Sequence, residues 1–199
     1  ASPINSKKYK NQRKNDMVLL ETERLVIRDN IPDDLEDFYE LLSDDGVTKF
    51  IPGHKVKSIE EARARLQISI DESISDKRTK YFFSIIEKQT NEYIGTIGYL
   101  VEEEHNNEKL VDLGYLIKKK YWNNGYTTEA AKKVIEYAFL YDNVIKIKAG
   151  CLEENFSSEK IMINCGLIKE GHLREQQFHE GKWKDRVIYG ILKSEWEAK

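Results

Sequence analysis

The stretch that decides the fold is Tyr121-Trp122-Asn123-Asn124-Gly125-Tyr126-Thr127-Thr128-Glu129-Ala130. A largely apolar run before it, residues 110–117, predicts a strand, and apolar residues recur at helical spacing over residues 130–139. The stretch therefore lies at a helix N-terminus, where backbone N–H groups have no intrahelical partner and the helix dipole is positive. Gly125 has no Cβ to obstruct the close approach of an anion to the backbone. The sequence therefore predicts an anion-binding loop, with a diphosphate as the best-fitting ligand.

The loop differs from two better-known phosphate-binding motifs. It lacks the Gly-Lys-Ser/Thr that binds a nucleoside triphosphate with magnesium, and it lacks the Gly-x-Gly-x-x-Gly that binds a dinucleotide. By itself it is equally consistent with an ordinary strand-to-helix turn that contains one glycine. The choice between the two interpretations depends on the rest of the chain.

Composition sets the class of protein. The chain has 199 residues, 40% of them hydrophobic, and no stretch looks like an interdomain linker, so we expect one domain over residues 17–199. Residues 1–16 are polar and basic, and we interpret them as a tail of native or vector origin. No apolar run approaches the length of a transmembrane helix, and the tail lacks the apolar centre of a secretory signal. We expect a cytoplasmic protein with no membrane partner.

Charge and metal-binding residue types narrow the partners. A net charge of -3 and a pI of about 5.9 argue against a general nucleic-acid surface, although the basic tail keeps nucleic-acid binding open as a hypothesis. Cys151 and Cys165 resemble small buried hydrophobic residues and suit a reducing compartment. The four histidines have no paired metal-ligand spacing and no Cys-x-x-Cys occurs, so no metal site is expected.

The remaining patterns predict an ordered series of elements. We expect a strand at 21–28, helices at 32–44 and 58–74, a meander of strands at 81–87, 93–101 and 110–117, and the helix after the loop. A strand at 144–151, a short helix at 156–164 and a hairpin over 167–192 complete the series. The strand–helix–strand unit around the loop implies that strands 110–117 and 144–151 are parallel.

Several motifs in this order resemble the GCN5-related N-acetyltransferases, the GNAT superfamily. Gly114-Tyr115 and the loop are similar to the family's acetyl-coenzyme A motif, Gln/Arg-x-x-Gly-x-Gly/Ala, with departures at Trp122 and Thr127. Further matches are Leu20-Glu21-Thr22-Glu23-Arg24-Leu25, Glu154-Asn155-Phe156-Ser157-Ser158, Asn164-Cys165-Gly166-Leu167 and the hairpin with Gly181-Lys182-Trp183-Lys184-Asp185. Together they are most similar to the RimJ/RimL-like branch, which acetylates the N-termini of ribosomal proteins.

The resemblance implies an α/β (α+β) fold with a mixed, mostly antiparallel sheet of roughly seven strands, flanked by about four helices. In that fold the parallel strands splay apart, and the pantetheine of acetyl-CoA, the co-substrate, enters the gap. Its amides would bind the backbone of Leu116, Ile117 and Lys118. A backbone N–H near Leu116 or Ile117 would polarise the thioester carbonyl, and we name Leu116 for this catalytic role. The diphosphate would lie on Asn123, Asn124, Gly125, Tyr126, Thr127 and Thr128. Asn155 and Ser158 would also contact the co-substrate, although Asn155 is equally explained as a helix cap.

The implied reaction is direct attack of a primary amine on the acetyl thioester, and the amine must first lose a proton. Asp112 is the candidate base because it is the one carboxylate inside an apolar strand, where partial burial would raise its pKa; a structural role and a charge partner are the alternatives. Many family members protonate the leaving thiolate with a tyrosine on the short helix. Residues 156–164 contain none, so water is the expected acid.

We therefore expect an acetyl-CoA-dependent N-acetyltransferase that acts on a protein N-terminus, such as that of a ribosomal protein, or on a small amine. The alternative is a non-catalytic acyl-CoA-binding module, which Thr127 and the missing helix tyrosine leave open. Phe178 and Trp183 near the hairpin turn suggest self-association as a homodimer.

Overall fold

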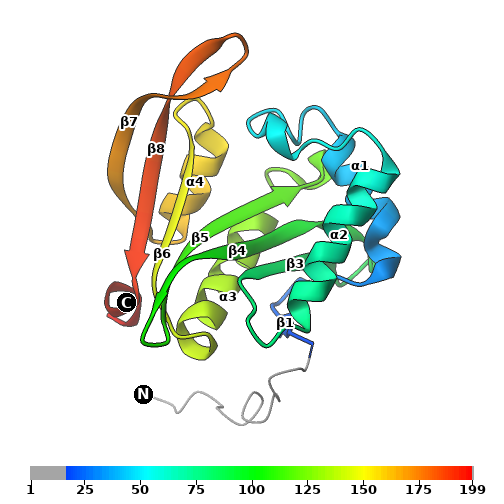
Figure 1. The fold of residues 1–199 in the computed structure, drawn as a ribbon, viewed down its shortest axis with the longest axis horizontal. Coiled ribbons are helices and arrows are strands. Elements are labelled where there is room, and N and C mark those ends of the chain that lie inside the picture. The colour runs from blue at the N-terminus through cyan, green and yellow to red at the C-terminus, as the bar shows by residue number, and fades with distance from the viewer. Residues whose placement is uncertain (1–16, 199) are drawn as a thin grey trace.

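A computed structural model describes residues 17–198 as an eight-stranded sheet between two layers of helices (Figure 1). The strands are β1 (Leu19–Glu21), β2 (Leu25–Asp29), β3 (Lys80–Glu87), β4 (Tyr93–His105), β5 (Glu108–Ile117), β6 (Val144–Leu152), β7 (Ile168–His179) and β8 (Lys182–Leu192). The helices are α1 (Leu35–Ser43), α2 (Ile59–Ser73), α3 (Tyr126–Tyr141), α4 (Phe156–Asn164) and α5 (Lys193–Glu197), with short 3-10 turns η1 (Pro32–Asp34), η2 (Pro52–His54) and η3 (Lys119–Tyr121). The expectations about residues 1–16, including the basic nucleic-acid tail, lie outside the described residues.

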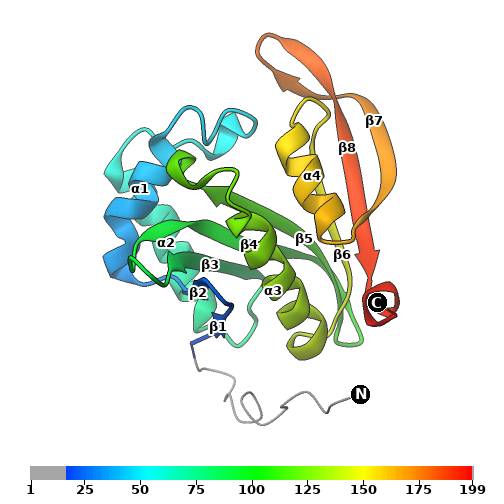
Figure 2. The ribbon, with the colours of Figure 1, turned by 180° about the vertical axis from the view of Figure 1, so that it is seen from behind.

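The strand order is β1-β2-β3-β4-β5-β6-β8-β7, and every neighbouring pair is antiparallel except β5 and β6. Helices α3 and α4 cover one face, and α1 and α2 cover part of the other (Figure 1, Figure 2). The predicted mixed sheet with one parallel pair is therefore confirmed. None of the helices in residues 17–198 combines the length and the apolar character that crossing a membrane requires.

The largest core lies between the sheet and α3. The apolar stripe that predicted this helix is fully inside: Ala130, Ala131, Val134, Ile135, Ala138 and Phe139 are all buried. A second cluster joins α1 and α2 through Leu35, Phe38 and Leu66. Helix α2 starts where predicted, since Ser58 Oγ accepts from the backbone N–H of Glu61. It ends at Ser73, so Ile74, the last residue of the expected helix, lies outside it and is 65% exposed.

Three further differences from the predicted elements have local causes. The first expected strand is two strands, β1 and β2, separated by the turn Thr22-Glu23-Arg24. Ile145, inside the expected strand 144–151, is the extra residue of a bulge in β6 and is 43% exposed, although its apolar side chain alone would favour the core. Helix α5 was not predicted; Glu195 accepts from the Leu192 N–H, and Trp196 packs on Phe139 with ring centroids 5.6 Å apart.

The parallel pair stays together over only part of its length. Pairing between β5 and β6 runs from Lys109 opposite Val144 to Asp112 opposite Lys148. Beyond that point β5 continues to Ile117 along β4, whereas β6 continues to Leu152 along β8. The two strands therefore diverge toward the end that leads into the loop and α3, which leaves the predicted gap between them.

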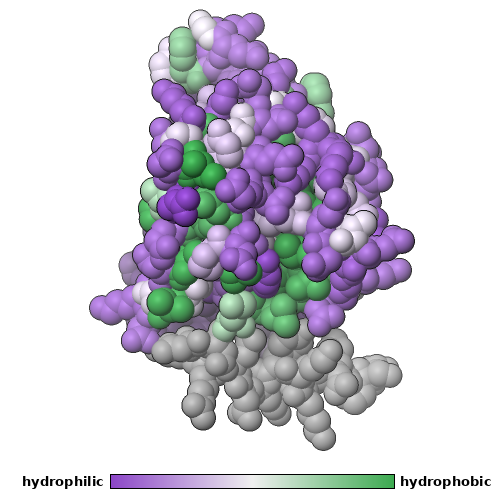
Figure 3. Space-filling view, turned by 90° about the vertical axis from the view of Figure 1, so that its right-hand side faces the viewer, coloured by the Kyte–Doolittle hydropathy of each residue, from purple (hydrophilic) through white to green (hydrophobic). Residues whose placement is uncertain are grey.

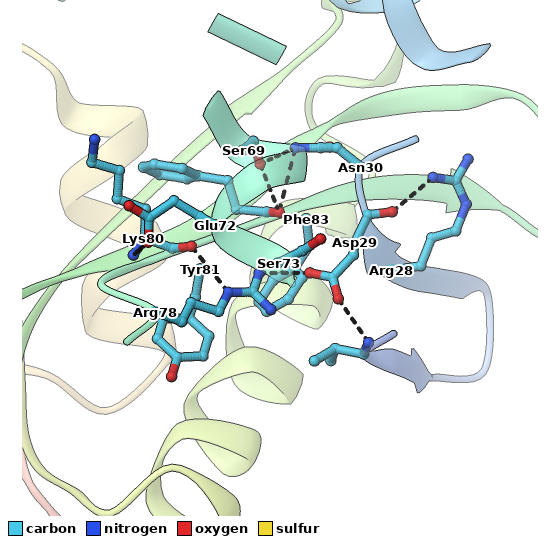
Figure 4. A network of polar contacts seen from close by, with 12 residues as sticks. Arg28, Asp29, Asn30, Ser69, Glu72, Ser73, Arg78, Lys80, Tyr81 and Phe83 are labelled. Atoms are coloured by element: carbon cyan, nitrogen blue, oxygen red, sulfur yellow. Dashed lines mark hydrogen bonds and ion pairs between the residues drawn. The ribbon is translucent and has the colours of Figure 1, made fainter. Parts of the chain in front are cut away.

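A buried polar network fixes α2 and the start of β3 to the end of β2 (Figure 4). Asp29 accepts from Arg78 Nη2 at 2.6 Å and from the backbone N–H of Val18 at 2.7 Å. Its neighbour Asn30 donates to Ser69 Oγ of α2 at 2.6 Å. Because Arg78 and Asp29 are almost completely buried, their ion pair is screened little by water. The side of the molecule that lies on the right in Figure 1 has a mainly hydrophilic surface, with hydrophobic residues in smaller groups (Figure 3).

Candidate functional site

The loop between η3 and α3 has the geometry of an anion site. Asn123 and Gly125 adopt left-handed backbone conformations, with φ of 61° and 78°, and Gly125 is the N-cap of α3. No side chain caps the helix. Within residues 17–198, the backbone N–H groups of residues 123–128 donate no hydrogen bond to the protein. Six N–H groups at the positive end of the helix dipole are therefore free to bind an anion.

Side chains on both sides hold this loop in shape. The indole Nε1 of Trp122 donates to the Ile117 carbonyl at 2.8 Å, which ties the loop to the end of β5. Asn124 Nδ2 donates to the Trp122 carbonyl at 2.9 Å. The sequence motif showed Trp122 only as a departure from Gln or Arg, and the structure gives the indole a fixing role. Sequence reasoning also missed Arg24, whose Nη1 donates to the Asn124 carbonyl at 3.0 Å.

The direction of the N–H groups along β5 corrects two predicted roles. Lys109 donates its N–H toward β6, to Asn143 O, and Lys118 donates toward β4, to Ile94 O. The bulges lie in β4 and β6, so the N–H direction alternates without a break along β5. Tyr115 and Ile117 therefore present their N–H groups to the gap.

Leu116 and Lys118 instead direct their N–H groups to β4. A Cβ on Gly95 would lie 2.2 Å from the Leu116 carbonyl oxygen, which also places the Leu116 peptide on the β4 side. This direction of its N–H does not support the thioester-polarising role predicted for Leu116, whereas the N–H of Ile117, the other residue considered for that role, faces the gap together with that of Tyr115. The Lys118 side chain points to α1, where Nζ bonds Asp37 at 2.6 Å and also Glu40, so this lysine ties β5 to α1.

On the far side of the gap, α4 begins at Asn155. Its Oδ1 accepts from the Ser158 N–H at 3.2 Å, so the helix-cap explanation of Asn155 is confirmed. The Tyr115 hydroxyl lies 2.9 Å from Ser158 Oγ and 3.1 Å from the Ser158 carbonyl, linking β5 to α4. Burial raises the pKa of Tyr115 well above its ordinary value, so the phenol stays protonated and available as a donor. Ser158, predicted to contact the co-substrate, already pairs with this tyrosine.

Asp112 stands where β5 and β6 stop pairing. Burial and the neighbouring Glu102 carboxylate raise its pKa, and the positive charges of Lys148 and Arg186 oppose this. Lys148 itself pairs with Glu102 at 2.6 Å, and Asp112 makes no ion pair in the described part of the chain. Among the described residues, a Cβ on Gly114, the next residue on the same face, would meet no atom within 4 Å, so this face of β5 is open at Gly114, two residues from Asp112.

Two groups of acidic side chains with a histidine come together from separate segments, which spacing in the sequence does not reveal. They are Glu153 with His172 and Asp185, and Glu154 with His179 and Glu180, each with ligand atoms within 4.8 Å of one another. Glu153 and Glu154 lie in the turn after β6, Glu180 lies in the turn of the β7–β8 hairpin, and the other three lie in its strands. In the second group the Lys184 ammonium already bonds Glu154 and, at 3.4 Å, Glu180. The expectation of no metal site stays a prediction.

Comparison with known proteins assigns the class. A family model described as an acetyltransferase (GNAT) domain matches residues 24–168. The chain is 32% identical to p20, an uncharacterized N-acetyltransferase of Bacillus licheniformis, over 90% of this chain and 99% of that protein. The chain therefore belongs to the GNAT family of N-acetyltransferases.

Solved structures agree on the fold. A GNAT-family acetyltransferase from Bacillus anthracis is similar with a TM-score of 0.75 and 28% identity, covering 89% of this chain and 99% of that one. The spermidine N-acetyltransferase of Vibrio cholerae, in complex with CoA and spermine, has a TM-score of 0.75 and 20% identity, covering 88% and 99%. At that lower identity the likeness concerns the fold and not the acceptor.

Proposed function

We propose that this N-acetyltransferase takes its acetyl group from acetyl-CoA and transfers it to a primary amine by direct attack. The observation that carries the proposal is the row of free N–H groups at residues 123–128, which lies beside the opening between β5 and β6. A diphosphate fits the first feature, because it needs several N–H donors at a helix N-terminus. An extended pantetheine arm fits the second, because the diverging strands leave backbone groups unpaired there.

The backbone around the gap offers partners for the diphosphate and for the pantetheine arm of acetyl-CoA. The loop N–H groups of Asn123, Asn124, Gly125, Tyr126, Thr127 and Thr128 would hold the diphosphate. The N–H groups of Tyr115 and Ile117 would bind the pantetheine arm and the thioester carbonyl. A preorganised donor at such a carbonyl is commonly worth about 3 kcal/mol in the transition state.

Asp112 is the proposed base. The open space at Gly114 on the same face and the raised pKa of Asp112 suit a carboxylate that accepts a proton from an ammonium group. Asp112 lies three residues before Tyr115, a separation of about 10 Å along an extended strand. The proton therefore passes through water rather than directly. Water also remains the proposed acid for the thiolate, because α4 has no tyrosine and the Tyr115 hydroxyl is engaged with Ser158.

The acceptor is a primary amine, either a protein N-terminus, as the RimJ/RimL-like motifs imply, or a small amine. The hairpin β7–β8 contacts the connection between α1 and α2, because Gln177 donates to the Phe50 carbonyl at 3.3 Å. A cavity of about 290 Å³ beneath this contact is lined by both signs of charge, including Lys49, Lys55, Asp45 and Glu180. It favours neither acceptor class, so the acceptor must be identified by experiment.

The test is release of free CoA thiol from acetyl-CoA in the presence of single amines. The panel pairs peptides that begin with alanine or serine with polyamines, and N-acetylated versions of the same peptides serve as controls. Turnover with any free amine, and none with its blocked version, is the expected result. Binding of acetyl-CoA without turnover on the whole panel would favour the alternative, a non-catalytic acyl-CoA-binding module.

Location and assembly complete the proposal. Both cysteines are free thiols and buried, which suits a cytoplasmic protein.

Phe178 and Trp183 are 58% and 60% exposed near the hairpin turn, and their rings pack edge to face with centroids 5.6 Å apart. We propose that this pair supports a homodimer; a monomer at every concentration in light scattering would rule it out.

A further inference from the structure

The turn between β1 and β2 touches the phosphate-binding loop, although about a hundred residues separate them in the chain. The contact is made through Glu129, in the first turn of α3. Its carboxylate accepts from Thr22 Oγ1 at 2.6 Å, from the Arg24 backbone N–H at 3.0 Å and from Arg24 Nε at 2.7 Å. Hydrogen bonds from both side-chain and backbone donors of the turn therefore attach it to the start of α3.

Arg24 also reaches past Glu129 and contacts the loop itself. While Nε and Nη2 bind Glu129, Nη1 donates to the carbonyl oxygen of Asn124 at 3.0 Å. The guanidinium lies over the Tyr126 ring, 4.3 Å from its centroid, and Tyr126 in turn packs edge-on against Tyr121. The arginine is therefore held in one orientation by a carboxylate, an aromatic face and a backbone carbonyl.

This orientation fixes one peptide group of the loop. A trans peptide is planar, and its C=O and N–H point in opposite directions. Because Arg24 holds the Asn124 carbonyl on its own side, the N–H of Gly125 points away from Arg24 and into the loop. Gly125 also needs its left-handed φ of 78° for this arrangement.

We propose that Arg24 is a positioning residue that sets the 124–125 peptide so that the Gly125 N–H faces the diphosphate of acetyl-CoA. The inference rests on the proposed function. It assigns a role in co-substrate binding to the motif Leu20-Glu21-Thr22-Glu23-Arg24-Leu25, in addition to its place at the end of β1, in the turn and at the start of β2. Lysine cannot replace arginine here, because one ammonium lacks the planar fork that reaches Glu129 and the Asn124 carbonyl together.

The experiment compares ligands with and without the diphosphate. For Arg24→Lys and Arg24→Gln, the dissociation constants of CoA and pantetheine are measured by calorimetry, and KM is measured for acetyl-CoA and S-acetylpantetheine. Both variants should bind CoA about tenfold more weakly and should raise KM for acetyl-CoA by a similar factor. The reason is that they lose the charge-assisted hydrogen bond that orients the 124–125 peptide. Pantetheine binding, KM for S-acetylpantetheine and kcat should not change.

Lys88→Gln is the matched control. Lys88 Nζ bonds the Thr22 carbonyl at 2.6 Å and Glu21 at 3.1 Å, so it supports the same turn without touching the loop. This variant should keep the native affinity for CoA. Native CoA affinity in Arg24→Lys, an equal loss for both ligands, or an equal loss in Lys88→Gln would overturn the inference. A native protein that binds neither CoA nor pantetheine would overturn the proposed function as well.

Discussion

Asp112 is the site residue whose surroundings make the sharpest prediction about pH. If its carboxylate accepts the amine proton, the rate must fall as pH drops through its pKa, which burial and Glu102 raise above the ordinary 3.8. Asp112→Asn should lower kcat on the order of 100-fold or more and remove the acidic limb of the pH profile. Acetyl-CoA affinity should remain native, and an unchanged kcat would assign the base elsewhere.

The same substitution should make the fold more stable. The folded pKa of Asp112 is raised above its unfolded value, so the ionised carboxylate is disfavoured in the fold. That cost is absent below the unfolded pKa, grows as pH rises toward the folded pKa and is complete above it. Asp112→Asn should therefore raise the melting temperature at neutral pH, with the gain disappearing in acid. A lower melting temperature at neutral pH would show that the carboxylate is structural.

At the scale of elements, the attachment of α2 and β3 to β2 depends on the buried pair Arg78–Asp29. Arg78→Met leaves the buried Asp29 carboxylate with the Val18 N–H as its only partner among the described residues, which should lower the free energy of unfolding by about 3 kcal/mol. Lys55→Met breaks an exposed pair with Asp45 and should cost less than about 1 kcal/mol. Urea unfolding measures both, and equal losses would mean that the buried network does not anchor α2.

The elements themselves were largely predictable, because their signals are local. The apolar stripe of α3, the Ser58 cap of α2 and the meander β3–β5 are each encoded within one stretch of chain. The misplaced residues depend on neighbours instead. Ile145 is turned outward by a bulge that exists only because β6 pairs with β5, and α5 depends on Trp196 meeting Phe139.

The candidate site was predictable in place but not in detail. The loop and the gap follow from motif order, whereas the N–H direction at Leu116 depends on how β5 pairs with both neighbours. The contact from Arg24 to the Asn124 carbonyl joins two distant segments, and neither segment alone indicates it. Asp112 could be proposed from the sequence because a lone carboxylate in an apolar strand is a local anomaly, and the structure adds the open space at Gly114 on the same face.

For the whole molecule, the proposed function makes sheet, loop and helix together one binding surface for acetyl-CoA. Mixed sheets that splay one parallel pair place free backbone groups next to a helix N-terminus, so binding depends on main-chain geometry more than on particular side chains. This explains how Thr127 and Trp122 can depart from the family pattern while the loop keeps its shape. Acceptor choice is a property of the site rather than of the fold and can vary without changing this architecture.

The most direct test of this account is thermal unfolding with acetyl-CoA, using NAD and ATP as controls and Gly125→Val as the matched variant. At a hundred times its dissociation constant, acetyl-CoA should stabilise the native protein by about 2.7 kcal/mol, whereas NAD and ATP should not. Valine at position 125 cannot easily adopt the left-handed φ of 78°, so the variant should lose most of the shift. No shift with acetyl-CoA, or an equal shift in Gly125→Val, would contradict the assignment of residues 123–128 as the co-substrate site.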